Sequence, residues 1–386
     1  MTEKNVQALK VVWTLNRISG FGPQRFKELC EAVSPIEQLV TPEVSARLSA
    51  DSAWGPRFVS DFEQAFGLPD FEQERDACEK LGINMIHCFD PAYPTRLREI
   101  FDPPLVLYVR GSFVPEDEIA IAIVGTRRPS VYGLRTARRF ASELAARGVT
   151  VVSGMARGID GEAHRGAISV RGRTIAVLGS GLDVIFPKEH AGLFEQIAAN
   201  GAVVSEFPLG TLPLPFHFPK RNRIISGLTM GVLAVEANER SGSLITTSCA
   251  LDEGREVYAI PGPVDSVTSR GTNQLIQRGA KLASSADDIL CDLSPQIRAA
   301  LPPAQTSGEE QTEDPILKLL CGERPVHFDE LVASSGFDAH DLSDRLIRLE
   351  LAGQVKRTLG GEYKMIRTQH HEKNSIKPPF HPINKI

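Results

Sequence analysis

The middle of the chain alternates short apolar segments with longer segments of helical periodicity. The apolar segments are rich in β-branched residues: IAIAIV (119–124), VTVVS (149–153), TIAVL (174–178), AVVSE (202–206), MGVLAVE (230–236) and EVYAI (256–260). Continuously apolar strands that alternate with helices are typical of a parallel sheet buried on both faces. The pattern therefore predicts a doubly wound α/β domain over residues 117–293. In such a domain, ligands bind at the carboxyl ends of the strands.

The N-terminal part of the chain has only helical patterns, broken by glycine and proline. It predicts a small helical domain over 1–70, followed by a connecting segment over 71–116. The sequence ISGFGPQRF (18–26) places two glycines in a turn between two helices, and Pro23 opens the second helix. This pattern resembles a helix-hairpin-helix, whose turn amides can face a DNA phosphate. A tight interhelical turn without a ligand explains the same residues.

The C-terminal part changes composition twice. Residues 294–314 are rich in proline and polar residues and predict a flexible linker. Residues 315–366 contain three helical stretches and then a strand–turn–strand pattern around Gly360 and Gly361, which predicts a winged helix. Residues 367–386 carry four Lys or Arg side chains against one acid and predict a disordered basic tail.

The expected recognition helix of this winged helix has an excess of acidic side chains. The stretch DAHDLSDRLIRLELAG (338–353) carries Asp338, Asp341, Asp344 and Glu350 against Arg345 and Arg348. Acidic side chains repel phosphates and disfavour docking in the major groove. Contact with a protein, or contact with DNA through Lys356 and Arg357 of the wing alone, fits the sequence better.

Composition excludes several classes of protein. The chain is 42% hydrophobic and 24% charged, and no apolar run approaches the ~18 residues of a membrane-spanning helix. The start, MTEKNVQALK, has no signal segment, which predicts a cytoplasmic protein. The six cysteines have no metal-ligand or disulfide spacing. A net charge of −5 does not indicate nucleic-acid binding, so such binding would depend on local charge.

Local charge is strongly positive beside the predicted strand ends. Between residues 125 and 173 there are ten arginines and three acids, a balance of 10 − 3 = +7. The stretch FPKRNR (218–223) adds three more basic residues. We predict phosphate binding by the basic residues at strand ends, because the arginine fork fits phosphate: Arg127, Arg128, Lys220, Arg221 and Arg223. The alternative is a network that pairs them with Glu206, Glu236 and Asp183.

Loops with glycine or serine follow the predicted strands. They read GTRRPS (125–130), SGMARGID (153–160), GSGLDVIFP (179–187), EFPLG with FPKRNRIISG (218–227), and EANERSGSLITTSCA (236–250). Glycine lets the backbone approach a ligand closely, and the start of the following helix offers free amides to an anion. Five such loops on one sheet, two of them with arginine clusters, predict an anion-binding site.

Common catalytic signatures are missing. GSGLDV (179–184) has valine where a nicotinamide fingerprint needs its third glycine, and neither a P-loop nor a GxSxG elbow occurs. Asp160 and His164 have a spacing that could hold a metal, but a helix cap at Asp160 and local packing of His164 explain them more simply. Glu236 is the best candidate for a lone acid in the cleft. No nucleophile, base and oxyanion hole assemble, so we expect no catalytic residues, no metal and no cofactor.

These motifs closely resemble the bacterial DNA-processing protein A family (DprA, also called Smf). The resemblance rests on IVGTRRPS, SGMARGIDGEAH, GSGLDVIFPKEH, SEFPLG, FPKRNRIISGL, VEANERSGSLITTSCALDEGREVYAIPG and GTNQLIQRGA, in family order across 120–280. It implies an extended Rossmann-like domain, flanked by a small helical domain and a winged helix. It further implies a non-enzymatic protein that prefers single-stranded DNA and dimerises through the α/β domain. Such a protein protects incoming strands and helps load RecA recombinase over single-strand-binding protein during natural transformation.

The resemblance also implies which residues bind DNA. Together with the basic residues at the strand ends, the predicted DNA-binding set is Gly125, Arg127, Arg128, Ser153, Gly154, Arg157, Lys220, Arg221, Asn222, Arg223, Ser241, Gly242 and Ser243. Phe186 stands where many members have tyrosine, so a role for a tyrosine hydroxyl is in doubt.

Physical reasoning leads to the same kind of binding. A pocket of amides and arginines can hold phosphates of a flexible strand, whereas duplex DNA is too stiff and too wide to enter it. We therefore predict salt-sensitive, largely sequence-independent binding. Two alternatives stay open: a nucleotide-binding protein that senses nucleotides, and a nucleoside-monophosphate hydrolase. The hydrolases of this type use a PGGxGT loop, where this chain has SGSLIT (241–246).

Overall fold

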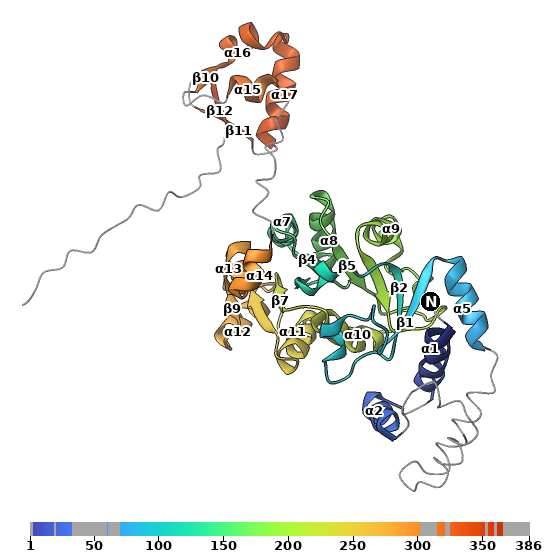
Figure 1. Cartoon of the computed structure of the whole chain (residues 1–386). Helices are drawn as coiled ribbons and strands as arrows, with labels where there is room; N and C mark the ends of the chain where they lie inside the picture. Colours follow the sequence, from blue (N-terminus) through green and yellow to red (C-terminus); the bar gives the residue numbers. More distant parts are fainter. Residues whose placement is uncertain are drawn as a thin grey trace, which may run out of the picture. The chain divides into compact units, whose positions relative to one another are not determined.

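The structure is a computed structural model of the chain. It describes residues 3–18, 21–32, 60, 70–301, 315–320, 325–351, 354–358 and 361–365. The chain divides into two compact units, Met1–Gln305 and Thr306–Ile386, and both appear in Figure 1.

The described part of the first unit is built on a nine-stranded sheet. The strands are β1 (Ile83–His87), β2 (Val106–Gly111), β3 (Ala120–Val124), β4 (Thr150–Ser153), β5 (Thr174–Val177), β6 (Ala202–Ser205), β7 (Gly231–Ala234), β8 (Glu256–Ala259) and β9 (Lys281–Leu282). Their order is β1-β2-β6-β5-β4-β3-β7-β8-β9, and all neighbours from β6 to β9 are parallel. The strands β3 to β8 coincide with the six predicted segments, which confirms the α/β fold.

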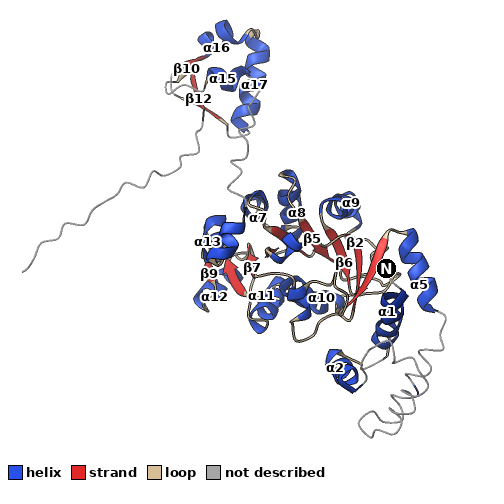
Figure 2. Cartoon of the chain, viewed as in Figure 1, coloured by secondary structure: helices blue, strands red, loops and turns tan. Residues whose placement is uncertain are grey.

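Helices cover both faces of the sheet (Figure 2). One face carries α7 (Val131–Ala146), α8 (Ile159–Ser169), α9 (Ala191–Asn200) and α13 (Ala286–Asp292); the other carries α10 (His217–Gly227) and α11 (Ser243–Asp252), and α12 (Arg270–Gln277) precedes β9. The alternation of side chains along β3 shows the two layers. Ile121 belongs to the same buried cluster as Phe140 of α7, whereas Ala122 belongs to the cluster that includes Ile224 of α10. Because both faces are buried, the strands are continuously apolar.

The sheet order reverses at β3. From β3 the chain runs outward through β4, β5 and β6, then returns to place β7 on the other side of β3. Loops after β3 and β7 therefore leave the sheet side by side, which opens a crevice at their carboxyl ends.

The segment 71–116 is more than a connection, and that expectation is wrong. It contains α5 (Asp70–Lys80), β1, α6 (Thr95–Arg98) and β2. Strand β2 pairs with β6 in antiparallel orientation and β1 pairs with β2, so the segment extends the sheet. The sequence of β2 follows two prolines, a pattern that is typical of a loop. Its partner strand β6 lies almost a hundred residues further along the chain.

The N-terminal helices pack on this extension. Helix α1 (Glu3–Asn16) contacts β1 and β2, and Trp13 Nε1 donates a hydrogen bond to the Tyr108 hydroxyl at 3.1 Å. Helix α2 (Pro23–Ala32) begins at Pro23, as predicted. Gly20 of the expected turn lies outside the described residues, so phosphate contact by this turn stays a prediction.

The second unit is a winged helix. It contains α15 (Pro315–Leu319), β10 (Val326–His327), α16 (Phe328–Ser335), α17 (Ala339–Leu351), β11 (Val355–Arg357) and β12 (Glu362–Met365). The strands form an antiparallel sheet in the order β10-β12-β11, and the unit has its own apolar core around Leu331, Leu342 and Leu346. This confirms the predicted winged helix. Strand β10 was not predicted from the sequence.

The predicted linker, residues 294–314, begins with regular structure. Residues Pro295–Ala300 form a short helix, α14, whose first turn is capped by the Ser294 hydroxyl. Residues 302–314 and the predicted tail 367–386 lie outside the described residues. None of the described helices has the length and apolar character needed to cross a lipid bilayer.

One buried histidine leads to a pH-dependent stability. His164 of α8 is fully buried, and its Nδ1 lies 2.7 Å from the Thr174 hydroxyl. The Thr174 hydroxyl donates to the Val151 carbonyl oxygen, so it accepts from His164 and the neutral ring carries its proton on Nδ1. Burial lowers the pKa of His164 to about 3. The ring therefore stays neutral in the native state at all moderate pH values.

We expect the free energy of unfolding to fall as the pH drops below about 6.5. The pKa is lower in the folded than in the unfolded state, so the unfolded state binds one more proton between about pH 6.5 and 3, and acid favours unfolding. The loss reaches about 2 kcal/mol at pH 5. Urea unfolding of the wild type and of His164→Asn at pH 7.5 and 5 measures it. The variant should lose less stability than the wild type; parallel losses would contradict the assignment.

Candidate nucleic-acid interface

A cavity of about 810 Å³ opens at the carboxyl ends of β3 and β7, where the sheet order reverses. Its walls come from the loops after β3 and β7, from the start of α8, and from α10 and α11. The residues that line it include Gly125, Thr126, Arg127, Arg128, Asp160, Phe186, Phe218, Arg221, Asn222, Asn238, Ser241, Gly242, Ser243 and Thr268. Eight of the predicted DNA-binding residues therefore meet at one cavity.

Arg221 of α10 forms the floor of this cavity. It is only 3% exposed, and its Nη1 donates hydrogen bonds to the carbonyl oxygens of Gly154, at 2.9 Å, and Val177. These contacts join the ends of β4 and β5. A Cβ at Gly154 would collide with the guanidinium, so glycine is required there for close approach. Burial lowers the pKa of Arg221 to about 10, and the side chain stays charged at neutral pH.

Asp160 is the acid that faces this cavity. Its carboxylate accepts the backbone N–H groups of Ala156 and Gly154, in the loop before α8, and the charges of Arg221 and Arg127 favour its ionised form. Burial outweighs these contacts and raises the pKa of Asp160 above its ordinary value. The helix itself is capped by Gly158 without a side-chain bond, so the expected helix cap at Asp160 is wrong. Within the described ranges, no group of three or more His, Cys, Asp and Glu side chains could hold a metal.

Arg127 and Arg128 stand at the mouth of the cavity, and both are exposed. The Arg127 guanidinium lies over the Phe218 ring, 4.9 Å from its centroid, and the Phe186 ring lies 5.9 Å from Phe218. The aromatic contact holds Arg127 without neutralising it. A hollow of about 50 Å³ beside it is lined by Gly154, Arg157 and Phe186, among others.

The start of α11 forms the opposite wall. A Cβ placed at Gly242 would meet no atom within 4 Å, and its φ of −61° is open to any residue. Packing therefore does not require glycine there, and the space above Gly242 belongs to the cavity. The Ser241 and Ser243 hydroxyls are 2.7 Å apart, and Asn222 Nδ2 donates to the Gly242 carbonyl oxygen at 3.4 Å. Amides at a helix start attract anions.

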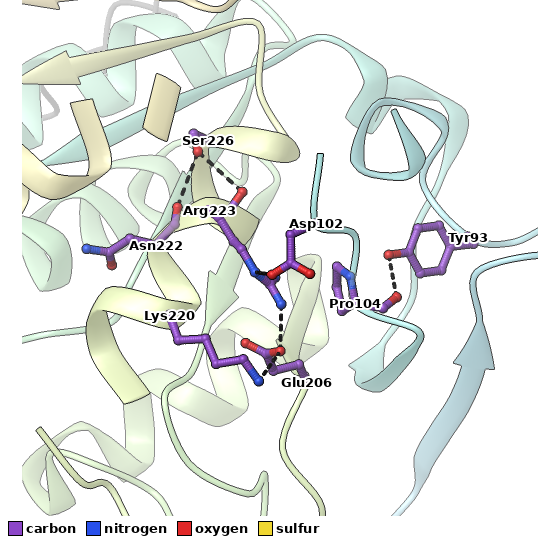
Figure 3. Close-up of polar contacts among 8 residues, drawn as sticks. All are labelled: Tyr93, Asp102, Pro104, Glu206, Lys220, Asn222, Arg223 and Ser226. Atoms are coloured by element: carbon purple, nitrogen blue, oxygen red, sulfur yellow. Dashed lines mark hydrogen bonds and ion pairs between the residues drawn. The ribbon is translucent and has the colours of Figure 1, made fainter. Parts of the chain in front are cut away.

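Two of the predicted phosphate ligands, Lys220 and Arg223, do not line the cavity and contact acidic side chains instead (Figure 3). Arg223 Nη2 lies 2.7 Å from Glu206 Oε2 and its Nε lies 2.8 Å from Asp102 Oδ2, while Lys220 Nζ lies 3.1 Å from the same Glu206 oxygen. Arg223 is 14% exposed and Lys220 is 54% exposed. The alternative network with Glu206 therefore describes the observed contacts of both residues.

Three further predicted residues have local roles. Ser153 is buried, and its hydroxyl donates to the Ile123 carbonyl oxygen at 2.6 Å. Gly125 lines the cavity, but a Cβ there would also come within 2.6 Å of the Ile159 side chain, so packing alone requires glycine. Arg157 is exposed and forms an ion pair with Glu189.

Glu236 is not a lone acid in the cleft, and that expectation is wrong. It is 3% exposed, and its two carboxylate oxygens accept the Ser130 backbone N–H at 2.9 Å and the Ser130 hydroxyl at 2.6 Å. It thereby fixes the start of α7. Asp183 likewise accepts the backbone N–H of Gly210 at 2.8 Å.

Sequence reasoning did not single out several cavity residues. Thr126 and Phe218 lie inside quoted motifs, and Asn238 lies in the loop after β7, so their positions at strand ends were a usable signal. Thr268 had no such signal, because it lies between two quoted motifs, three residues before GTNQLIQRGA (271–280), and does not follow directly after a strand.

The fold and the cavity together define a class: Rossmann-like proteins with a basic site at the switch point of the sheet, followed here by a winged helix. Comparison of the sequence with models of known protein families leads to the same class. Residues 84–294 match the family described as DNA recombination-mediator protein A, and residues 298–361 match the DprA winged helix domain. The chain belongs to this DprA/Smf family of DNA-processing proteins, which confirms the resemblance.

Individual relatives are similar to this chain over most of their own length. Protein Smf of Synechocystis is 37% identical over an alignment of 395 positions, which covers 93% of this chain and 98% of the relative. Protein Smf of Escherichia coli is 41% identical over 292 residues, covering 74% of this chain and 78% of the relative. The crystal structure of DNA processing protein A from Streptococcus pneumoniae has 34% sequence identity and a TM-score of 0.63, and covers 76% of this chain and 99% of that one.

Proposed function

We propose that the chain binds single-stranded DNA in the cavity at the switch point of the sheet. One observation carries the proposal: the exposed Arg127, the buried charge of Arg221 and the open helix start at Gly242 face the same space. An arginine fork and a helix start both bind phosphate. Membership in a family of DNA-processing proteins supports DNA as the source of the phosphate.

The shape of the site favours a single strand. The charges line a recess, so a phosphate must enter it, and a flexible strand can bend one phosphate inward. Duplex DNA bends only over many base pairs. The cavity offers charge and amides more than base-edge partners, which favours binding that depends little on sequence.

The wider role that we propose is supported by the resemblance to the family. We propose that the chain receives and protects incoming single strands in the cytoplasm and helps load RecA recombinase over single-strand-binding protein during DNA uptake. The protein would act as a homodimer through its Rossmann-like domain, so that two cavities engage one strand with increased avidity. It would act by binding, without a catalytic step of its own.

Fluorescence anisotropy with a labelled single strand and the matching duplex across a salt series tests the proposal. We expect tighter binding of the single strand and a slope of log K against log salt of about −1.5 to −2, from two or three phosphate contacts. A chain ending at Leu301 should keep the preference. Duplex preference, or loss of binding with that truncation, would move DNA recognition to the winged helix.

A conservative change at the helix start should separate binding from stability. Gly242→Ala is expected to leave the melting temperature unchanged, since nothing lies within 4 Å of the added methyl group. The methyl group occupies the space of a phosphate, so affinity for the single strand should fall by about three- to tenfold, or ~1 kcal/mol. Anisotropy and thermal unfolding measure the two effects. Unchanged affinity would place the strand elsewhere.

The second candidate function is nucleoside-monophosphate hydrolysis, and the buried Asp160 beside Arg127 is the observation that favours it. A carboxyl group in such a recess can act as a general acid or base. Chromatography of each nucleoside monophosphate incubated with the wild type and with Asp160→Asn tests this role. Release of free base by the wild type alone would establish it and would overturn the purely binding role.

A further inference from the structure

The wing of the second unit carries a pair of lysines on one face. In the hairpin of β11 and β12, Lys356 lies directly opposite Lys364, flanked by the pairs Val355–Met365 and Arg357–Tyr363. Val355 and Tyr363 are buried in the core of this unit. Because side chains alternate along a strand, Lys356 and Lys364 point to the opposite face, and both are exposed.

This pair of charges is not neutralised by the described part of the chain. No described carboxylate lies within 4.0 Å of either lysine amine, whereas Lys281 of the first unit has two such partners. Like charges directly opposite each other destabilise a strand pair. Arg357 adds a third exposed charge at the same hairpin, with its guanidinium 5.9 Å from the Tyr363 ring centroid. A bound anion would remove this repulsion.

The neighbouring helix α17 has the opposite character. Its exposed acids are Asp338 at its start, then Asp341, Asp344 and Glu350. The Asp338 carboxylate caps the helix by accepting the backbone N–H groups of His340 and Asp341. Arg345 lies over the Phe337 ring at 4.4 Å. A nucleic acid is therefore repelled by this helix and attracted by the hairpin.

We propose that the β11–β12 hairpin is a second phosphate-binding site, which takes the backbone of the same single strand that occupies the cavity of the first unit. The inference rests on the proposed function. The two lysines project from one face and can reach phosphates that neighbour each other in a flexible strand. The acidic side chains of α17 disfavour the major-groove docking by which winged helices read duplex DNA, so a single strand fits better.

The covalent connection allows both sites to engage one strand. The two units, Met1–Gln305 and Thr306–Ile386, are consecutive parts of one chain. Once the cavity holds the strand, the hairpin meets further phosphates at a high effective concentration. A long strand can bridge both sites, whereas a short oligonucleotide occupies the cavity alone.

Anisotropy with the full chain and two strand lengths tests this inference. The probes are labelled oligothymidines of about 8 and about 60 nucleotides, together with a long duplex. The double variant Lys356→Glu/Lys364→Glu should bind the long strand about five- to tenfold more weakly, with a salt slope reduced by about 1.4. Its affinity for the short strand should equal that of the wild type. Arg348→Glu, an exposed charge reversal on α17, is the matched control and should change neither affinity.

The outcomes separate the inference from the function on which it rests. If the wild type binds neither oligonucleotide, the proposed function fails. If the wild type binds both and the double variant matches it on the long strand, the hairpin site is refuted. Equal losses in the double variant and in Arg348→Glu, or a loss confined to the duplex, also refute it. Circular dichroism of each variant verifies that the winged helix remains folded.

Discussion

Replacement of Arg127 by alanine is expected to weaken binding of single-stranded DNA by about ten- to a hundredfold. Arg127 is exposed at the mouth of the cavity and lies over Phe218, so its guanidinium is held in place and keeps its charge. A charge-assisted hydrogen bond to phosphate contributes about 1.5–3 kcal/mol, and each 1.4 kcal/mol is tenfold in affinity. Anisotropy at constant salt measures the change.

Two further variants make this result specific. Arg135→Ala removes an exposed arginine of α7 that does not line the cavity, so its effect should be less than twofold. Arg127→Lys keeps the charge and loses the planar fork, and should recover only part of the affinity. The melting temperature should stay constant in all three variants. An Arg127→Ala protein that binds like the wild type would exclude this cavity as the main DNA site.

Sequence pattern alone was sufficient to locate the central sheet. Segments such as IAIAIV and VTVVS are continuously apolar because helices cover both faces of β3 and β4, and this burial is visible in the composition of each strand. Strand β2 was missed because two prolines precede it and because its pairing with β6 joins distant parts of the chain. Short-range periodicity contains no information about such a partner.

The same limit applies to the basic residues of α10. Spacing shows that Lys220 and Arg223 share one helical face, since they are three residues apart. It does not show which neighbour that face meets. In the structure it meets Glu206, whereas Arg221 and Asn222 turn to the sheet and the cavity. Burial of Arg221 below the loops also depends on Gly154, whose missing side chain makes room for the guanidinium.

The largest expected effect on stability belongs to Arg221. Arg221→Ala should lower the free energy of unfolding by about 3–5 kcal/mol, the usual cost of leaving a buried charge uncompensated. The variant leaves the carbonyl oxygens of Gly154 and Val177 without their donor, and it removes the positive charge that most favours the ionised form of Asp160. Urea unfolding followed by circular dichroism measures the loss.

A double variant can isolate how much the charge of Asp160 contributes to this loss of stability. Once Arg221 is gone, the buried carboxylate has lost its main favourable partner, so Asp160→Asn in the Arg221→Ala background should restore about 1–2 kcal/mol. The same change alone should not stabilise the wild type by that amount, since the Arg221 charge is still there. Asn222→Ala, one residue along α10, is the matched control and should cost about 1 kcal/mol or less. A loss below about 1 kcal/mol in Arg221→Ala would show that the floor of the cavity does not depend on this guanidinium.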